Sequence, residues 1–466
     1  MLWNLRSGRL PQSRYSPTRQ ARRGLTAANS RGGEHRPSGV LILLSGEPRV
    51  YAGDVDYEFR QENNLYYLTF LNQTGSILVL MPGHTRHREL LFLPARNPAL
   101  ETWSGPMHSA EEASQISGVT EIWDAREFEP FLAALRARQT YRPKSQNILK
   151  TDSAQPAAQF AQLNGYESLY ASANRGEASL SLLLPREELS REFRREQELA
   201  SRLARTASGY RLRDATPIFA TLRERKSPFE LRLLQHAVDI TIEALGRAMA
   251  AANQARWEYE LEAEIDYTFK RRHADHAGYP SIVGCGGNAT TLHYVDSSGP
   301  VRLTDLVLMD VGAEYQHYTA DVTRTFPANG KFNSAQSEIY KLVLDAQQAS
   351  LRVIRPGVMH QEVHRAALDT IKDGLLRLGL ITDRNSDQYR LWFMHGTSHF
   401  LGMNVHDVGV GGKLEPNMVF TVEPGIYIRE DALDYLPDTL ENAKLKVAIK
   451  PAFEKYKNIG VRIEDD

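Results

Sequence analysis

The stretch LVLMDVGAEYQHYTADVTRTF, residues 306–326, decides how the C-terminal half of this chain folds. Its two ends are rich in β-branched and apolar residues and its centre is polar, which predicts two antiparallel strands around a turn near Tyr315 and Gln316. That turn sets Asp310 directly opposite Asp321, with Cβ atoms about 4.5–5.5 Å apart. Carboxylates this close repel each other unless one is protonated or both bind a shared cation. In another register the same acids would be ordinary exposed hairpin residues, and this alternative stays open.

Three later segments add side chains that suit a metal centre. MHGTSHFLGMNVHD (394–407) holds three histidines, VFTVEPG (419–425) carries one glutamate and GVRIEDD (460–466) another. Three histidines so close together favour a site over a single core histidine, but they cannot all be ligands of an oxygen-rich centre. Four oxygen ligands and one nitrogen ligand suit a pair of divalent cations. The candidate ligands are Asp310, Asp321, His399, Glu423 and Glu464.

Strand alternation predicts which side chains share a face in the last two segments. Val419, Thr421 and Glu423 fall on one face, and Arg462 and Glu464 fall together on one face of theirs. A plain ion pair is the simplest interpretation of that Arg and Glu. The same arginine is also a candidate support for a metal-bridging carboxylate.

The glycine-rich segment IVGCGGN (282–288) precedes His293. It lacks the Lys-Ser/Thr pair of a P-loop and the GxGxxG spacing, so we interpret it as a tight turn and not as a phosphate cradle. Cys285 has no base beside it in the sequence, and we expect a structural role for it. As the single cysteine, it also excludes an internal disulfide framework and a cysteine-based zinc cluster.

The N-terminal half has the pattern of a small α/β domain. A strand near residue 121 and a helix around 127–138 are expected, and residues 176–213, dense in Arg and Glu, predict a solvated helix near the domain boundary. Short apolar runs that end in Gly or Pro predict buried strands at 40–46, 76–83 and 89–94.

The C-terminal half mixes helices with antiparallel strands, which favours an α+β domain. Its first helix should start at Ser227-Pro228, an N-cap residue followed by proline at the first helical position. Residues 429–458 look polar and aperiodic, and we expect an irregular insertion there. Further helices are predicted at 257–275, 334–355 and 360–379.

Composition limits the partners and the location of the protein. The chain has 466 residues, enough for two or three domains, and a net charge of −1, which gives no global field for nucleic acid or an anionic membrane. No apolar run approaches the ~20 residues that span a bilayer. The first 33 residues carry seven Arg and neither Lys nor acid. We expect residues 1–38 to be a disordered basic leader on a cytoplasmic protein, with a mitochondrial transit peptide as the alternative.

Six segments in order resemble the pita-bread metallopeptidases, and within them the Xaa-Pro aminopeptidases (aminopeptidase P). They are TLHY, MDVGAEY, YTADVTRTF, HGTSHFLGMNVHD, VEPGIY and GVRIEDD. FRQENNLYYLTFL (59–71) is similar to a segment of that family's N-terminal domain, although Phe70 stands where Gly is usual. The resemblance implies a creatinase-type α/β domain at 39–215 and an α+β pita-bread catalytic domain at 216–466.

The resemblance also implies a role for each matching residue. Two metal ions, usually Mn²⁺, would be bound, one by Asp310 and the other by His399 and Glu423, with Asp321 and Glu464 bridging both. The catalytic residues would be His293, His406, Glu423 and Arg462. The substrate would be bound by His293, His395, His406 and Tyr427.

By the same resemblance, a hydroxide bridging the two metal ions would attack the carbonyl that precedes proline. Glu423 would carry the proton to the leaving nitrogen. The partners implied are peptides with proline in the second position, and the chain is expected to form a homo-oligomer, either a dimer or a tetramer.

Four alternatives remain beside this interpretation. A prolidase would cleave Xaa-Pro dipeptides with nearly the same metal ligands. A non-catalytic pita-bread module would bind ligands without hydrolysis, but such proteins generally lose metal ligands, and all five positions here carry competent side chains. A creatine-type amidinohydrolase does not keep the full ligand set, and a methionine aminopeptidase usually lacks the N-terminal domain.

Overall fold

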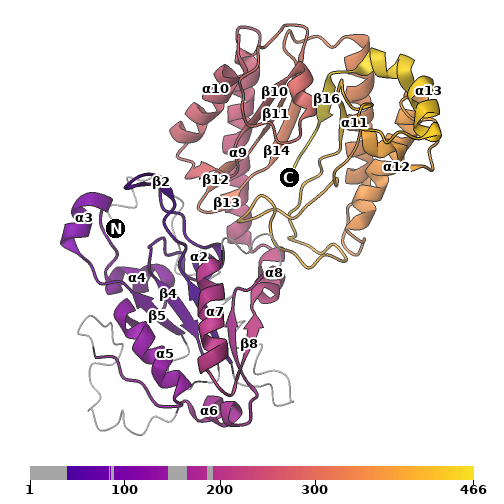
Figure 1. The fold of residues 1–466 in the computed structure, drawn as a ribbon. Coiled ribbons are helices and arrows are strands. Elements are labelled where there is room, and N and C mark those ends of the chain that lie inside the picture. The colour runs from indigo at the N-terminus through magenta and orange to yellow at the C-terminus, as the bar shows by residue number, and fades with distance from the viewer. Residues whose placement is uncertain (1–38, 83, 85–88, 145–164, 186–192) are drawn as a thin grey trace. The chain divides into compact units, whose positions relative to one another are not determined.

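The computed structural model describes residues 39–82, 84, 89–144, 165–185 and 193–466. The chain divides into two compact units, residues 1–222 and 223–466, which are described separately (Figure 1). The expected leader at 1–38 lies outside the described residues. Within the part of the chain that is described, no helix combines the length and the apolarity needed to cross a bilayer.

A six-stranded mixed sheet forms the centre of the first unit. Its strand order is β6-β5-β4-β1-β7-β8, in which β1 pairs antiparallel with β4 and parallel with β7. The three buried strands predicted from apolar runs are confirmed as β1, β4 and β5. The strands are β1 (Gly39–Leu44), β4 (Ile77–Leu80), β5 (Glu89–Leu93), β6 (Ile122–Asp124), β7 (Ala178–Leu182) and β8 (Tyr210–Asp214), and a separate hairpin joins β2 (Val50–Ala52) to β3 (Val55–Asp56).

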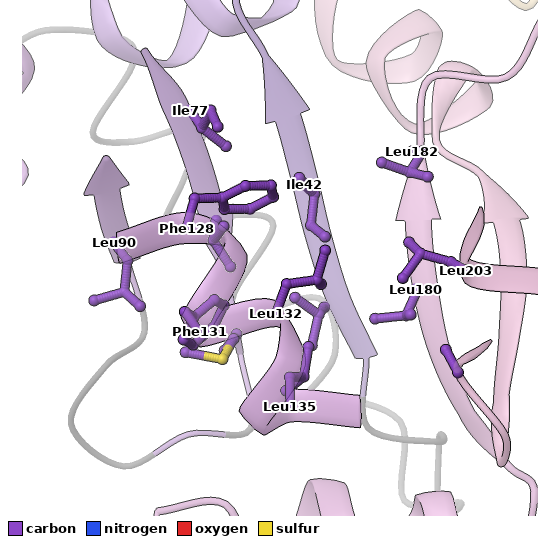
Figure 2. Close-up of a cluster of buried hydrophobic side chains, with 14 of the residues drawn as sticks. Ile42, Ile77, Leu90, Phe128, Phe131, Leu132, Leu135, Leu180, Leu182 and Leu203 are labelled. Atoms are coloured by element: carbon purple, nitrogen blue, oxygen red, sulfur yellow. The ribbon is translucent and has the colours of Figure 1, made fainter. Parts of the chain in front are cut away.

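Helices cover this sheet and complete its core. Figure 2 shows Phe128, Phe131 and Leu132 of α5 among strand residues such as Ile42 and Ile77. Each fully buried large apolar side chain contributes about 1.5–3 kcal/mol, so this cluster dominates the stability of the unit. The helices of the unit are α2 (Asn63–Thr69), α3 (Pro98–Ser104), α4 (Ala110–Ser117), α5 (Phe128–Arg136), α6 (Glu167–Asn174) and α7 (Arg194–Thr206), and α8 (Thr216–Glu224) follows them; a short 3₁₀ helix, η1 (Ala125–Glu127), precedes α5.

The prediction of one solvated helix over 176–213 is wrong. Two strands, β7 and β8, flank α7 in this stretch. Most of the Arg and Glu residues described in α7 and β8 are exposed, whereas Glu196, Leu199 and Leu203 of α7 are buried. Because β8 is an edge strand, its exposed Arg211 and Arg213 protect it from pairing with other chains. The density of Arg and Glu correctly indicated solvent exposure, but the exposed residues belong to a helix and a strand and not to one helix.

The short helix α2 ends in an unusual conformation. The Glu62 carboxylate caps its start by accepting from the backbone N–H groups of Asn64 and Leu65. Phe70 ends it with φ 55°, the left-handed conformation in which glycine is favoured. The Phe70 ring is buried and packs edge-on against Tyr66, with 5.2 Å between ring centroids. Ring burial offsets the backbone strain, which explains how phenylalanine is tolerated there.

Two substitutions of Phe70 separate these effects. Phe70→Ala and Phe70→Gly both remove the ring, but only glycine relieves the left-handed strain. We expect Phe70→Gly to be more stable than Phe70→Ala by about 1 kcal/mol, the reverse of the usual helix preference. Urea unfolding of the two variants measures the difference. An alanine variant that equals or exceeds the glycine variant would contradict this account of the cap.

A buried acid in the same unit makes its stability depend on pH. Burial raises the pKa of Glu196 to about 7, with Glu62 and Glu47 adding to the effect. This folded-state pKa lies above the value in the unfolded chain, so the folded state favours the protonated Glu196 carboxyl. Its contribution to the free energy of unfolding is fully present below about pH 4.5 and is lost as the pH rises through 7. We expect Glu196→Gln to raise the free energy of unfolding by about 1–3 kcal/mol at pH 8 and to change it little at pH 4. Denaturant unfolding at both pH values tests this, and an equal effect at the two would contradict it.

The second unit places small antiparallel sheets beside long helices. The predicted helices are confirmed, and the first begins with a capping box between Ser227 and Glu230. Its helices are α9 (Pro228–Ala251), α10 (Glu258–Arg271), α11 (Ser334–Val353), α12 (Gln361–Leu378) and α13 (Leu440–Tyr456), with 3₁₀ helices η4 (Gly286–Thr290) and η5 (Asp387–Leu391). Its strands are β9 (His276–Ala277), β10 (Ile282–Cys285), β11 (Leu306–Val311), β12 (Ala313–Tyr315), β13 (Tyr318–Thr319), β14 (Val322–Pro327), β15 (Gly425–Ile428) and β16 (Ile459–Arg462).

Three sheets and one large core organise these elements. The sheets have the orders β10-β11-β14, β13-β12-β9 and β15-β16, and all their pairings are antiparallel. Apolar residues of α11, α12 and α13 pack with those of β15 and β16 in one buried cluster. The unit has the mixed helix and sheet content expected of a pita-bread domain.

The expected irregular insertion at 429–458 is wrong, because α13 occupies most of it. Its buried residues Leu445, Ile449 and Phe453 recur every fourth position. Charged residues between them, and Pro451 inside the helix, hid that period in the sequence.

The predicted strand register is also wrong. Asp310 pairs with Thr323, not with Asp321, because the turn centre lies one residue later, at Gln316 and His317. Both turn residues have positive φ, 49° and 67°, as a tight two-residue hairpin requires. Moving the centre by one residue shifts the pairing by two, and side chains alternate between faces with a period of two. The two aspartates therefore stay on the same face as diagonal neighbours.

Candidate metal centre

A cavity of about 620 Å³ lies within the second unit, and it collects most of the residues expected from the sequence. Its lining includes all five candidate metal ligands, together with His293, His395, His406 and Arg462. Tyr427 is fully buried beside it and reaches His395 and Arg462 through its hydroxyl group. The residues come from segments that are up to 171 positions apart in the sequence, from His293 to Glu464.

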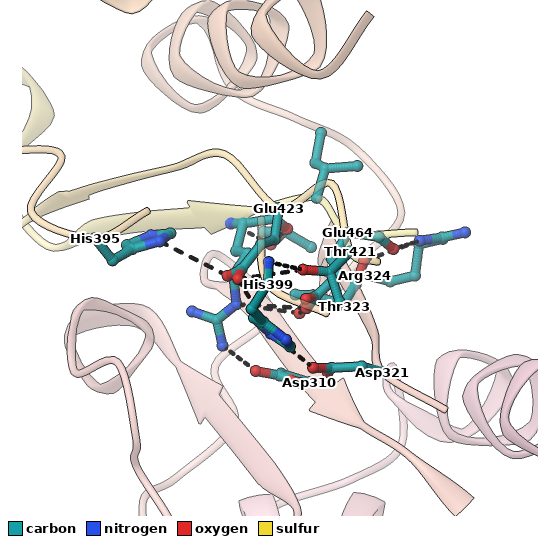
Figure 3. Close-up of polar contacts among 12 residues, drawn as sticks. Asp310, Asp321, Thr323, Arg324, His395, His399, Thr421, Glu423 and Glu464 are labelled. Atoms are coloured by element: carbon teal, nitrogen blue, oxygen red, sulfur yellow. Dashed lines mark hydrogen bonds and ion pairs between the residues drawn. The ribbon is translucent and has the colours of Figure 1, made fainter. Parts of the chain in front are cut away.

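Three ligand atoms, one each from Asp321, His399 and Glu464, lie within 4.8 Å of one another. His399 Nε2 is 3.4 Å from Asp321 Oδ2 and 3.3 Å from Glu423 Oε1. Figure 3 shows these side chains, with Asp310, converging from different segments. His399 therefore forms direct ion pairs with both acids, and the three ligand atoms of Asp321, His399 and Glu464 are close enough to one another to surround a small cation.

Backbone hydrogen bonds between the segments that carry the candidate metal ligands hold those side chains in position. The Thr421 N–H donates to the His399 carbonyl, and the Glu423 N–H donates to the Thr397 carbonyl. On the other side, the Glu464 N–H donates to the carbonyl of Thr323 in β14. The segments of His399, Glu423 and Glu464 are therefore held by backbone hydrogen bonds to neighbouring segments of the site.

Only the last residue of the predicted strand segment VFTVEPG (419–425) lies in a regular strand. The regular strand β15 starts at Gly425, and Glu423 lies just before it, where isolated bridges join Phe400 to Phe420 and Val422 to Asp465. The bond from Thr421 Oγ1 to Glu423 Oε1, 3.4 Å, shows that these two side chains lie together, as alternation predicted.

The negatively charged carboxylates of the site repel one another. Burial raises the pKa of Asp321 to about 6, and Asp310 beside it adds to the shift. Burial likewise raises the pKa of Glu423 to about 7, and it raises that of Glu464 together with Asp321 and Glu423. Buried carboxylates so close cannot all stay ionised without compensating positive charge.

The residues present fit a pair of divalent cations. Four carboxylates and one imidazole are the donors that hard and borderline cations prefer. The protein's own compensation is limited: burial lowers the pKa of His399, but Asp321 and Glu423 outweigh that and raise it to about 9. Divalent cations held by these carboxylates would supply the missing charge and keep them ionised.

Arg462 is a buried cation beside two of the acids, Asp310 and Glu464. It is 4 % exposed and donates from Nη2 to Asp310, from Nε to Thr323 Oγ1 at 3.1 Å and from Nη1 to the Tyr427 hydroxyl at 2.8 Å. Its Nε lies 3.9 Å from Glu464 Oε2. The expected pairing with Glu464 is therefore the weaker contact, and the direct partner is Asp310.

A chain of hydrogen bonds fixes the protonation of His395. The carbonyl of Gly396 lies 2.7 Å from its Nδ1 and must accept a proton from it, which leaves Nε2 to accept from the Tyr427 hydroxyl at 2.9 Å. That hydroxyl in turn accepts from Arg462. Burial, with Arg462 nearby, lowers the pKa of His395 to about 4, so its ring is neutral.

The other two histidines lie on different loops. The His406 ring is 4.4 Å from that of His399, and burial together with His399 lowers its pKa. Asp407 beside it forms a buried ion pair with Arg223, which anchors that loop. His293 lines the cavity from the segment after η4.

Two residues that contact the ligands were missed by the sequence reasoning. The Tyr279 hydroxyl is 2.5 Å from both Asp310 Oδ1 and Asp321 Oδ1, and Thr323 Oγ1 donates to Glu464 Oε2 at 2.5 Å. A tyrosine next to a proline carries no ligand signal in the sequence. Thr323 would have been found with the correct register, because it pairs with Asp310.

Comparisons with known proteins agree with this geometry. Residues 232–466 match the model of metallopeptidase family M24, and residues 19–142 match the aminopeptidase P N-terminal domain. The chain belongs to metallopeptidase family M24.

Curated relatives narrow the resemblance within that family. Xaa-Pro aminopeptidase of Escherichia coli is 34% identical over 442 residues, covering 92% of this chain and 88% of its own length. Its Haemophilus influenzae counterpart is 33% identical with the same coverage, and mouse Xaa-Pro aminopeptidase 3 is 31% identical over 92% of this chain and 75% of its own length.

Solved structures agree. Aminopeptidase P from E. coli with the inhibitor Pro-Leu superposes with a TM-score of 0.72 at 30% identity, covering 98% of this chain and 93% of that one. A Pseudomonas aeruginosa aminopeptidase gives the same TM-score at 28% identity, covering 98% and 92%. The predicted creatinase-type and pita-bread architecture is thereby confirmed.

The position of Tyr279 generates a prediction about metal affinity. Tyr279→Phe removes the hydroxyl that orients Asp310 and Asp321 but keeps the ring. Because groups that hold metal ligands typically contribute 10–100-fold in affinity, we expect metal binding to weaken by about that factor. Titration of the chelator-treated protein with Mn²⁺ measures it. Tyr267→Phe, at an exposed position on α10, is the matched control, and equal affinity in the two variants would refute the role of Tyr279.

Proposed function

We propose that this chain is a metal-dependent exopeptidase that releases the N-terminal residue from peptides with proline in the second position. One observation carries the proposal: Asp310, Asp321, His399, Glu423 and Glu464 converge on one cavity in a chain related to Xaa-Pro aminopeptidases along most of its length. The substrate is a peptide, and the bond cleaved is the one before proline.

The five ligands would hold two divalent ions, and we propose Mn²⁺ for both. Asp310 would serve one ion, His399 and Glu423 the other, with Asp321 and Glu464 shared. Bound there, such ions lower the pKa of a water molecule and polarise the carbonyl to be attacked.

The reaction adds water to the carbonyl carbon and breaks its bond to the proline nitrogen. Glu423 is the proton carrier, because its carboxylate lines the cavity 3.3 Å from His399 Nε2 and a carboxylate placed beside the reacting groups can accept and return a proton. It takes the proton that the attacking water loses and delivers it to the proline nitrogen as that nitrogen leaves. The released residue keeps the new carboxyl group, whose remaining proton passes to the freed amine or to solvent as the group ionises.

The remaining polar side chains bind and orient the peptide. His293 and His406 face the cavity and would donate to the carbonyl oxygen as negative charge develops there. Neutral His395, fixed by Tyr427 and Arg462, offers a rigid wall on the substrate side. Apolar residues complete the lining and suit the proline ring: Pro280, Ile282, Leu292, Val295 and Val405.

A homo-oligomer, dimer or tetramer, and a cytoplasmic location complete the proposal. Both rest on the resemblance to aminopeptidase P. The mass of the assembled protein in solution tests the first of them.

A hydrolysis assay with added Mn²⁺ tests the function. We expect turnover of Xaa-Pro-Yaa and little turnover of Xaa-Ala-Yaa. Removing the proton carrier in Glu423→Ala should lower kcat by at least about 100-fold. Glu441→Ala, at an exposed position in the first turn of α13, is the matched control and should keep full activity.

Three outcomes would contradict this function. A preference for Xaa-Pro dipeptides over longer peptides identifies a prolidase. Equal turnover of Xaa-Ala-Yaa removes the proline specificity. Absence of bound metal after reconstitution, measured by elemental analysis, favours a non-catalytic binding module.

A further inference from the structure

Glu258, at the start of α10, is a carboxylate with no exposed surface. Its Oε1 accepts from the Cys285 N–H at 2.6 Å and from Asn288 Nδ2 at 3.0 Å. Its Oε2 accepts from the Gly299 N–H at 2.6 Å and from the Tyr294 hydroxyl at 2.8 Å. All four donors are uncharged, so the negative charge is stabilised by converging hydrogen bonds.

The four donors share one feature: they all belong to the segment 285–299, which carries His293. That segment also contributes Leu292 and Val295 to the wall of the cavity. Donors from both ends of the segment and from its middle meet at one carboxylate. The position of the cavity-facing side chains between these donors therefore depends on Glu258.

Further hydrogen bonds link the donors to one another, and the packing around Glu258 leaves little free space. The Tyr294 hydroxyl donates to Glu258 while accepting from Asn288 Nδ2 at 3.0 Å and from the Ser298 N–H at 3.2 Å. The Glu258 N–H also donates to the Gly299 carbonyl at 2.9 Å. A Cβ atom at Gly299 would lie 2.8 Å from Glu258 Oε2 and 2.3 Å from Asn288 Nδ2, so only glycine fits.

A glutamate near the start of a helix does not need burial to be favourable, since it interacts well with the helix dipole at the surface. Burying a carboxylate is costly unless several donors satisfy it. Here every donor comes from the segment that faces the substrate cavity, and Tyr294 is the residue directly after His293. Burial at this position thus couples α10 to the substrate side of the site.

We propose that Glu258 is a positioning residue for His293, setting where its ring meets the substrate. The inference rests on the proposed substrate role of His293. Glu258 does not touch the candidate metal ligands through any of these bonds, so metal binding should be independent of it.

A double-mutant cycle with Glu258→Gln and His293→Ala tests this inference. The amide keeps the shape of the side chain but turns an NH₂ group toward N–H or O–H donors, which shifts the segment. We expect kcat/KM for Xaa-Pro-Yaa to fall about 10–100-fold, as small misplacements of substrate-binding groups do, with the metal content unchanged. In the double variant we expect no loss beyond that of His293→Ala, because residues that act as one unit are not additive.

A matched control separates positioning from general stability. Glu127 is likewise a buried carboxylate that accepts from a tyrosine hydroxyl, Tyr141, and from a backbone N–H, but it lies in the first unit. We expect Glu127→Gln to keep full kcat/KM even where it lowers the melting temperature. Should Glu258→Gln fail to fold, Tyr294→Phe removes one donor and keeps the carboxylate, and its loss should likewise vanish in the His293→Ala background.

The outcomes distinguish a failure of the substrate role of His293 from a failure of the positioning role of Glu258. Full activity of His293→Ala overturns the role of His293 and with it the positioning role of Glu258, while the metal-dependent hydrolysis stands. A reduced His293→Ala variant whose loss multiplies with that of Glu258→Gln overturns the positioning role alone. Loss of bound metal in Glu258→Gln also overturns it, because the effect would then act through the ligands.

Discussion

Mutual repulsion among buried carboxylates is the constraint on which the catalytic unit depends. Asp310, Asp321, Glu423 and Glu464 share one cavity, and burial, together with repulsion from the neighbouring acids, raises the pKa of three of them. A chain stabilised only by its core would exclude such a cluster. Its presence is understandable when divalent cations complete the site, and the fold around it then serves to hold repelling groups at fixed positions.

The protein holds them by pairing backbone to backbone and by surrounding the acids with donors. The segments of His399 and Glu423 pair with each other, and Glu464 pairs with β14 beside Asp310. Arg462, Tyr279 and Thr323 then contact individual carboxylate oxygens. The same design recurs at Glu258, where neutral donors hold a buried charge at the substrate side. Rigid supports of this kind are what a site needs to keep its ligands within reach of their target geometry.

The sequence was informative wherever a local pattern carries physical meaning. Continuous apolar runs located β1, β4 and β5, and Ser227-Pro228 located the start of α9. It failed where the signal is not local. Pro451 and interspersed lysines concealed α13, and an Arg- and Glu-rich surface concealed β7 and β8. At the site, all five candidate ligands reach the cavity, whereas Tyr279 had no recognisable signal.

The sequence by itself determined which chemical groups are available, because carboxylates and imidazoles keep their ligand chemistry in any fold. Its prediction that Asp310 and Asp321 share a face holds in the structure, because the observed register differs from the predicted one by two residues, which preserves side-chain alternation. Only the tertiary structure decided which groups touch: that Asp310 pairs with Thr323, and that Arg462 reaches Asp310 more closely than Glu464. Those contacts depend on where one turn is centred and on how distant segments pack, and neither is encoded in a local pattern of residues.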